Sequence, residues 1–295
     1  MYPRDARELL WRLAAARDGL DDDVHPVVVA ESVSVGAKAL LRDNQVGYYD
    51  TGGSLFLCHR GIYVHIDKPP PKALSSRERS LFSGHRARAV LALLLDPQHP
   101  FGATELAERS AVSVPTASVV LVELERHAWV ATTGRGPRKK RRLADPRALL
   151  DAWVAHLPSL RAPTARHYYV PFVGVDELAR RLGTVLDQHG LEHALTHEVA
   201  AQRYAPFLSS LSRVYCTVPL RPSRIPAMRE LGARRVDDGA NLTILVAPVG
   251  STLFRQRVDG QWLASPIEVY LDLLRDTRRR AADLAEHLRQ ECIGF

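Results

Sequence analysis

The chain has 295 residues, of which 46% are hydrophobic and 25% are charged. This balance is typical of a folded globular protein and excludes wholesale disorder, and the length predicts two or three modules. No apolar run is long enough to cross a bilayer, and three widely separated cysteines do not make a disulfide framework. We therefore expect a cytoplasmic protein with no membrane partner.

The first module is expected over residues 1–71. The spacing of Leu9, Leu10 and Leu13 predicts a helix over residues 4–17 that ends at Gly19. Three short apolar stretches, at residues 27–29, 55–57 and 62–66, are then expected to form strands. A helix at 36–43 lies between the first two and is followed by the stretch 46–50 and a turn at Gly52-Gly53. These elements predict a small α/β unit, and the three prolines that end at residue 71 predict a linker.

This first unit resembles a degenerate restriction-endonuclease-like fold. Glu31 follows one expected strand, and Asp50 closes the stretch 46–50 before another. Such nucleases also need an acid two residues before a lysine, to hold a divalent ion and activate water. Neither Lys38 nor Lys68 has an acid at that spacing. We therefore expect a scaffold with no catalytic residue, and a metal-dependent nuclease is the least favoured function.

The positive charge is concentrated in the middle of the chain. The formal net charge is +7. Residues 71–153 hold 14 basic and 8 acidic side chains, a net of +6, whereas residues 1–70 hold 8 and 10, and residues 154–295 hold 18 and 15. A basic segment of this kind indicates contact with a polyanion.

The second module, residues 72–157, has the pattern of a winged helix-turn-helix. Helices are expected at residues 83–95, 104–110 and 115–127, the first of them capped by Ser83. Strands at 129–132 and 142–144 then form a hairpin with its tip at 134–141, and a closing helix runs from Asp145 through Trp153. In this fold the third helix enters the major groove and the hairpin contacts the backbone.

Two sets of residues are therefore expected to contact double-stranded DNA, and a protein bound in this way would associate with the nucleoid. Ala117, Leu121 and Leu124 should face inward, which leaves the other side of the third helix for bases. The expected contacts on that helix and on the hairpin are Pro115, Thr116, Ser118, Val119, Arg135, Arg138, Lys139, Lys140, Arg141 and Arg142. Thr116 and the valines at 119 and 120 can touch thymine methyl groups. No long polar side chain is placed to read guanine, so a modest sequence preference is expected.

The third module, residues 158–295, is expected to be a separate α+β domain. Strands are predicted at residues 167–173, 212–218 and 242–247, and helices at 176–188, 192–201 and 266–290. His193 and His197 stand four apart on the second of these helices, but no third ligand is near, so we expect no metal and no cofactor. The terminal helix carries Arg275, Arg278, Arg279 and Arg280. These arginines are either a solvated face or a docking surface for a partner protein or for phosphates.

Three motifs, together with the winged-helix pattern, give the chain a resemblance to a known family. They are Tyr48-Tyr-Asp-Thr-Gly-Gly53, Asp238-Gly-Ala-Asn241 and Ser265-Pro-Ile-Glu-Val-Tyr-Leu-Asp-Leu-Leu274. The chain resembles the AbiEi-type antitoxins of bacterial type IV toxin–antitoxin pairs, with His197 at a position where glycine is expected.

The resemblance implies an α+β regulator that is not an enzyme. Such a protein binds its own operon's promoter or operator through the winged helix, and its C-terminal domain antagonises a cognate nucleotidyltransferase toxin. The alternative is a ligand-sensing transcription factor whose C-terminal domain binds a metabolite. A pocket with convergent polar groups would favour that alternative.

Overall fold

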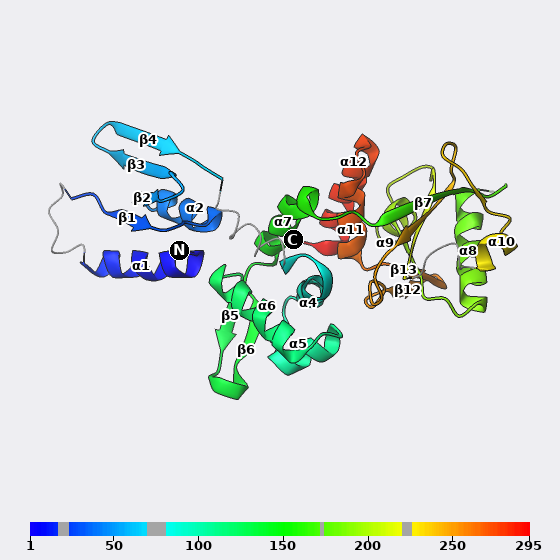
Figure 1. Ribbon diagram of the computed structural model, residues 1–295, viewed down its shortest axis with the longest axis horizontal. Coiled ribbons are helices and arrows are strands. Elements are labelled where there is room, and N and C mark those ends of the chain that lie inside the picture. The colour runs from blue at the N-terminus through cyan, green and yellow to red at the C-terminus, as the bar shows by residue number, and fades with distance from the viewer. Residues whose placement is uncertain (17–23, 70–80, 172–173, 220–225) are drawn as a thin grey trace. The chain divides into compact units, whose positions relative to one another are not determined.

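A computed structural model describes residues 1–16, 24–69, 81–171, 174–219 and 226–295. It is mixed α+β, as expected, and the chain divides into two compact units, Met1–Leu149 and Leu150–Phe295 (Figure 1). The finer division into three modules, with boundaries after residues 71 and 157, stays a prediction. In the part of the chain that is described, no helix is long and apolar enough to span a membrane.

The N-terminal elements form a four-stranded sheet with helices packed on one face. In chain order they are α1 (Pro3–Ala16), β1 (Val27–Ala30), α2 (Val35–Asp43), β2 (Gly47–Asp50), β3 (Leu55–His59) and β4 (Ile62–Ile66). The sheet order follows the chain, with β1 parallel to β2 and the other pairs antiparallel. Val28, Tyr48 and Phe56 are buried in one core with Ala6 and Leu41 of the helices. The two predicted helices and the strands predicted at 27–29, 55–57 and 62–66 are confirmed, and β2 is an additional strand. Gly19 and the end of the proline linker lie outside the described residues.

Three helices and a hairpin follow, and we call residues 84–143 the helix–hairpin segment. Its elements are α4 (Gly84–Leu95), α5 (Ala103–Arg109), α6 (Val114–Arg126), β5 (Val130–Thr133) and β6 (Lys140–Leu143), and α7 (Pro146–His156) comes next (Figure 1). Ser113 caps α6 by accepting a hydrogen bond from the Thr116 amide, and Pro115 stands in the first turn, where no amide is needed. Most of the boundaries of these elements agree with the predicted boundaries to within two residues.

The predicted hairpin tip was too long. Residues 134–141 were expected to form it, but β6 begins at Lys140 and pairs with β5 from Thr133↔Lys140 to Val130↔Leu143. A short 3-10 turn at Gly136–Arg138 reverses the chain. Because side chains alternate across a strand, this register places Lys140 and Arg142 on one face and Arg141 on the other.

The second unit contains a seven-stranded mixed sheet. Its strands are β7 (Thr164–Tyr169), β8 (Ala194–Thr196), β9 (Val214–Val218), β10 (Arg234–Arg235), β11 (Leu242–Val246), β12 (Gln256–Val258) and β13 (Gln261–Leu263), in the spatial order β10-β7-β11-β9-β8-β13-β12. Its helices are α8 (Val175–Gln188), α9 (His197–Tyr204), α10 (Pro226–Glu230), α11 (Pro266–Arg275) and α12 (Arg279–Leu288). The helix predicted at 176–188 and parts of all three predicted strands are confirmed, although residue 173 lies outside the described ranges.

Two helices predicted in this unit were wrong. Residues 192–201 are not one helix, because Ala194–Thr196 pairs with β9 and β13 and the helix begins only at His197. The terminal helix is also interrupted, since α11 ends at Arg275 and α12 begins at Arg279. The Asp276 carboxylate accepts hydrogen bonds from the backbone and guanidinium of Arg278, which holds the intervening turn.

Candidate nucleic-acid interface and polar sites

The start of α6 presents an outward face of small side chains. Pro115 is exposed, Thr116 and Ser118 are half-buried, and Val119 is 47% exposed. The inward positions are Ala117, Leu121 and Leu124, each 0% exposed as predicted. Val120, however, is also fully buried, so the expectation that it touches a thymine methyl group was wrong. Its side chain belongs to the core of the helix–hairpin segment.

The six basic residues of the hairpin fall into two groups. Arg135, Arg138, Lys140 and Arg142 are exposed, and we call them the outer four. Arg142 donates to the Gln98 side chain at 3.0 Å, and Lys140 lies 3.7 Å from the Glu105 carboxylate. Both contacts lie on the surface, where hydrogen bonds and ion pairs compete with water and contribute little to stability. The outer four can therefore reach an external anion.

Lys139 and Arg141 face Glu125 of α6 instead. The Arg141 Nε atom and the Lys139 Nζ atom each lie 2.7 Å from the Glu125 Oε1 atom, and the Thr132 hydroxyl donates to the same carboxylate at 3.0 Å. Arg141 is only 8% exposed. Burial opposes ionisation of Glu125, but these hydrogen bonds outweigh it and hold the Glu125 pKa below its usual value. The Glu125 cluster (Glu125, Thr132, Lys139 and Arg141) fastens the hairpin to α6.

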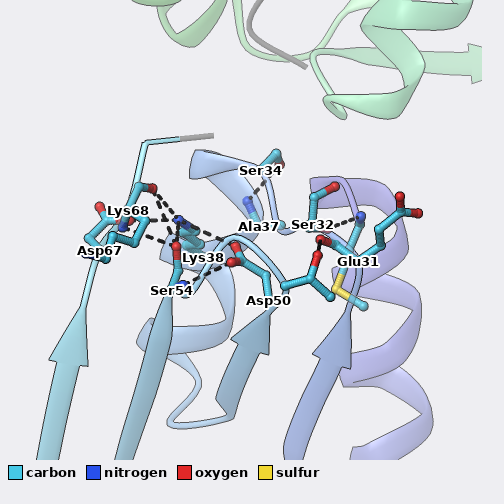
Figure 2. Close-up of polar contacts among 11 residues, drawn as sticks. Glu31, Ser32, Ser34, Ala37, Lys38, Asp50, Ser54, Asp67 and Lys68 are labelled. Carbon is cyan, nitrogen blue, oxygen red and sulfur yellow. Dashed lines mark hydrogen bonds and ion pairs between the residues drawn. The ribbon is translucent and has the colours of Figure 1, made fainter. Parts of the chain in front are cut away.

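A second polar cluster lies at one edge of the N-terminal sheet. Figure 2 shows Lys38 of α2 reaching the edge of the sheet where β3 begins and β4 ends. There its Nζ atom donates to the Ser54 hydroxyl and the Asp67 carboxylate, each at 2.7 Å. The same atom lies 3.8 Å from the Asp50 carboxylate. Lys38 and Asp50 are 5% and 3% exposed, so the ammonium group neutralises a buried acid.

Sequence spacing missed this cluster because the lysine reaches the acids through the fold. The helical spacing could have indicated that Lys38 is buried. Lys38 lies four residues after the capping Ser34 and three before Leu41, and therefore on the buried face of α2. The other Asp50 oxygen accepts from the Ser54 amide and closes the turn between β2 and β3. Among the described residues, no three His, Cys, Asp or Glu side chains are placed to hold a metal ion.

The histidine pair considered for a metal is separated by the fold. His193 precedes β8, whereas His197 opens α9 with a backbone φ of +55°. That left-handed conformation is the one glycine adopts most readily, which agrees with the glycine that the family resemblance implies there. Burial lowers the pKa of both imidazoles, so each is neutral near pH 7.

The four C-terminal arginines do not share one helix face. Arg275 ends α11, Arg278 lies in the turn, and Arg279 and Arg280 begin α12. Arg278 pairs with Asp276 and lies 3.6 Å from the buried Glu198, and Arg280 donates to the Ser210 carbonyl. The prediction that one terminal helix carries all four arginines was therefore wrong. A role for these residues in partner binding stays a prediction.

Two motifs of the resemblance have structural explanations. Asn241 accepts a hydrogen bond from the Val170 amide at 2.9 Å and donates to the Val170 carbonyl at 2.8 Å, which fixes the chain beyond β7. Ser265 and Glu268 form a capping box at the start of α11, with Pro266 in the first turn. Burial raises the pKa of Glu268 to about 7.

Comparison with known families identifies the class of protein. A family model described as "Transcriptional regulator, AbiEi antitoxin, Type IV TA system" matches residues 142–294, which is more than half of the chain. The chain is therefore a transcriptional regulator by class. It belongs to the AbiEi antitoxin family of type IV toxin–antitoxin systems, which confirms the resemblance, and membership implies a cognate toxin as partner. No curated protein and no solved structure matches it.

Proposed function

We propose that this chain is an autoregulating antitoxin that binds its own promoter through a winged helix-turn-helix and neutralises a nucleotidyltransferase toxin. The helix–hairpin segment is the proposed winged helix, within residues 72–157, with α6 in the major groove and the hairpin as the wing. The observation that carries this proposal is the exposure of the outer four on a hairpin that the Glu125 cluster fastens to α6, whose first turns present small side chains outward.

The proposed contacts divide by role. Pro115, Thr116, Ser118 and Val119 meet base edges, and the outer four meet phosphates, which adds affinity without sequence preference. Lys139 and Arg141 are proposed to act indirectly, because the Glu125 cluster holds them against α6. Thr116 bonds to Ser113 in the free protein at 2.8 Å, so its hydroxyl is already oriented at the helix start.

Fluorescence anisotropy with the promoter duplex and a scrambled duplex tests the DNA-binding part. Thr116→Ala and Ser118→Ala should each reduce the discrimination between the two duplexes by about 1 kcal/mol. Thr104→Ala, an exposed threonine near the start of α5, is the matched control and should leave the ratio unchanged. Equal binding of both duplexes by the unmodified protein contradicts the proposal.

Neutralisation is proposed to reside in the C-terminal domain, residues 158–295, and to be separable from DNA binding. Its near balance of 18 basic and 15 acidic residues over 154–295 suits a protein partner better than a nucleic acid groove. The test is growth of cells that express the toxin beside the full chain in which alanine replaces the outer four. Rescue at the unmodified level supports the division, and failure to rescue contradicts it.

A further inference from the structure

An open cavity of about 430 Å³ lies within the Leu150–Phe295 unit, and its lining includes Arg275 and Arg278 of the C-terminal arginines described above. Three guanidinium side chains line it, those of Arg213, Arg275 and Arg278. Its apolar wall includes Pro163 and Leu245. The cavity therefore combines a basic side with an apolar side, which is the usual construction of a site for a small charged molecule.

Only one of the three arginines pairs with an acid among the described residues. Arg278 is held by Asp276, and its guanidinium also donates to the Tyr215 hydroxyl at 3.4 Å. Arg213 and Arg275 have no acidic partner among the described residues, although the Arg213 guanidinium lies 6.0 Å from the Tyr215 ring centroid. Both side chains are only half-exposed. Their guanidinium groups are therefore available to an anion that enters.

The acids of the cavity are already engaged. Asp276 is bound by Arg278, and Asp272 accepts the Thr196 hydroxyl at 2.6 Å. With His197 neutral, the three arginines of the lining face Asp272, Asp276 and the adjacent Glu198, which lies 3.6 Å from Arg278. Arg213 and Arg275 are therefore the guanidinium groups that remain for an anion among the described residues. Asp272 can still accept a second hydrogen bond, from an amino or hydroxyl group of a ligand.

His197 supplies an independent observation that points to a ligand. The side chain is 7% exposed and lines the cavity, and its Nδ1 atom is buried with no hydrogen-bond partner among the described residues. The ring stacks on Tyr215 with centroids 3.9 Å apart and planes 11° apart. A buried polar atom without a partner calls for an explanation, and a left-handed backbone at a non-glycine residue is one of the strained conformations that cluster at functional sites.

We propose that this cavity binds a phosphate-bearing small molecule of mononucleotide size. The phosphate would lie against Arg213 and Arg275, because a guanidinium group matches phosphate oxygens through two parallel hydrogen bonds. The volume exceeds what a free anion fills, and the Tyr215, Leu245 and Pro163 side accommodates a planar apolar part. A nucleotide and inorganic phosphate share the anionic chemistry, and titration distinguishes them.

The test is isothermal titration calorimetry of the full chain with AMP, GMP, CMP and UMP, with inorganic phosphate and with adenosine. At least one nucleotide should bind with a Kd of about 1 mM or tighter, and phosphate and adenosine should each bind at least tenfold more weakly. Arg275→Gln should weaken nucleotide binding tenfold or more, because it removes a charge-assisted hydrogen bond. Arg279→Gln is the matched control, since Arg279 is exposed on α12 and does not line the cavity, and it should change the Kd less than twofold.

His197→Asn tests the imidazole without disturbing the backbone, because asparagine tolerates the left-handed conformation. The His197→Asn variant should weaken nucleotide binding several-fold. If this variant melts at a lower temperature than the unmodified chain, Arg213→Gln serves as the test in its place and should also weaken nucleotide binding several-fold. The proposal is overturned if no nucleotide binds at millimolar concentration, or if phosphate alone binds as well as the nucleotides do. It is also overturned if Arg279→Gln weakens binding as much as Arg275→Gln.

Discussion

Replacing Glu125 with glutamine should release the hairpin from α6. The substitution keeps the size of the side chain but removes the charge that Lys139 and Arg141 share. Arg141 is then buried without a counter-ion, and breaking a fully buried pair costs about 3–5 kcal/mol. Because the Lys139 side chain is 32% exposed and water can replace part of the interaction, we expect about 2–3 kcal/mol.

Hydrogen exchange read by mass spectrometry reports this local opening without requiring that the two units unfold together. Amide protection over residues 130–143 should fall by a factor of about 30 to 150, at 1.4 kcal/mol for each factor of ten. Peptides from α8 serve as an internal reference. Glu108→Gln, at an exposed glutamate of α5, is the matched control and should leave hairpin protection unchanged.

The effect should depend on pH with a defined sign. The pKa of Glu125 is lowered in the folded state, so its contribution to stability is complete above the ordinary glutamate range and is lost as pH falls below about 4.3. The variant and the unmodified protein should therefore converge in acid. Unchanged hairpin protection in Glu125→Gln at pH 7 would refute the role assigned to the Glu125 cluster.

Three further predictions concern the other sites. Because burial raises the pKa of Glu268 to about 7, the ionisation of Glu268 lowers the stability of the fold as pH rises from the ordinary glutamate range through 7. The Glu268→Gln variant keeps the capping box and should be about 1–2 kcal/mol more stable than the unmodified chain at pH 8, with no advantage near pH 4. A variant that is less stable than the unmodified chain at pH 8 contradicts this. Asn241→Ala should raise hydrogen exchange around Val170 by the equivalent of about 1–3 kcal/mol, whereas Asn44→Ala, at an exposed helix end, should not. Duplex, nicked and single-stranded DNA incubated with the protein and magnesium or manganese should show no cleavage above a Glu31→Ala, Asp50→Ala control, and cleavage that needs both carboxylates contradicts the scaffold assignment.

Local sequence patterns predicted most of the elements because capping residues, prolines and apolar spacing act over a few residues. Ser113-Val-Pro115 marks the start of α6, and the spacing of Ala117, Leu121 and Leu124 identifies its buried face. The motif around Ser265 likewise predicts the start of a helix. In these cases the residues that determine the conformation are neighbours in the chain.

The wrong predictions depended on contacts between distant residues. Ala194–Thr196 is buried on both faces of a sheet, and a short apolar stretch of that kind has no period that separates strand from helix. Lys38 meets Asp67 only after the sheet assembles. Arg141 faces inward because the register of β6 and the position of Glu125 require it, although its neighbours have the same charge.

The salt dependence of DNA binding tests the central claim most directly. Replacing the outer four together by alanine should make the slope of log affinity against log salt shallower, by roughly 0.9 for each phosphate that the variant no longer neutralises. A charge-matched control replaces four exposed arginines of the second unit, Arg180, Arg181, Arg234 and Arg235, and should leave the slope unchanged. An unchanged slope in the hairpin variant, or an equal change in the control, would mean that the hairpin is not the surface that meets DNA.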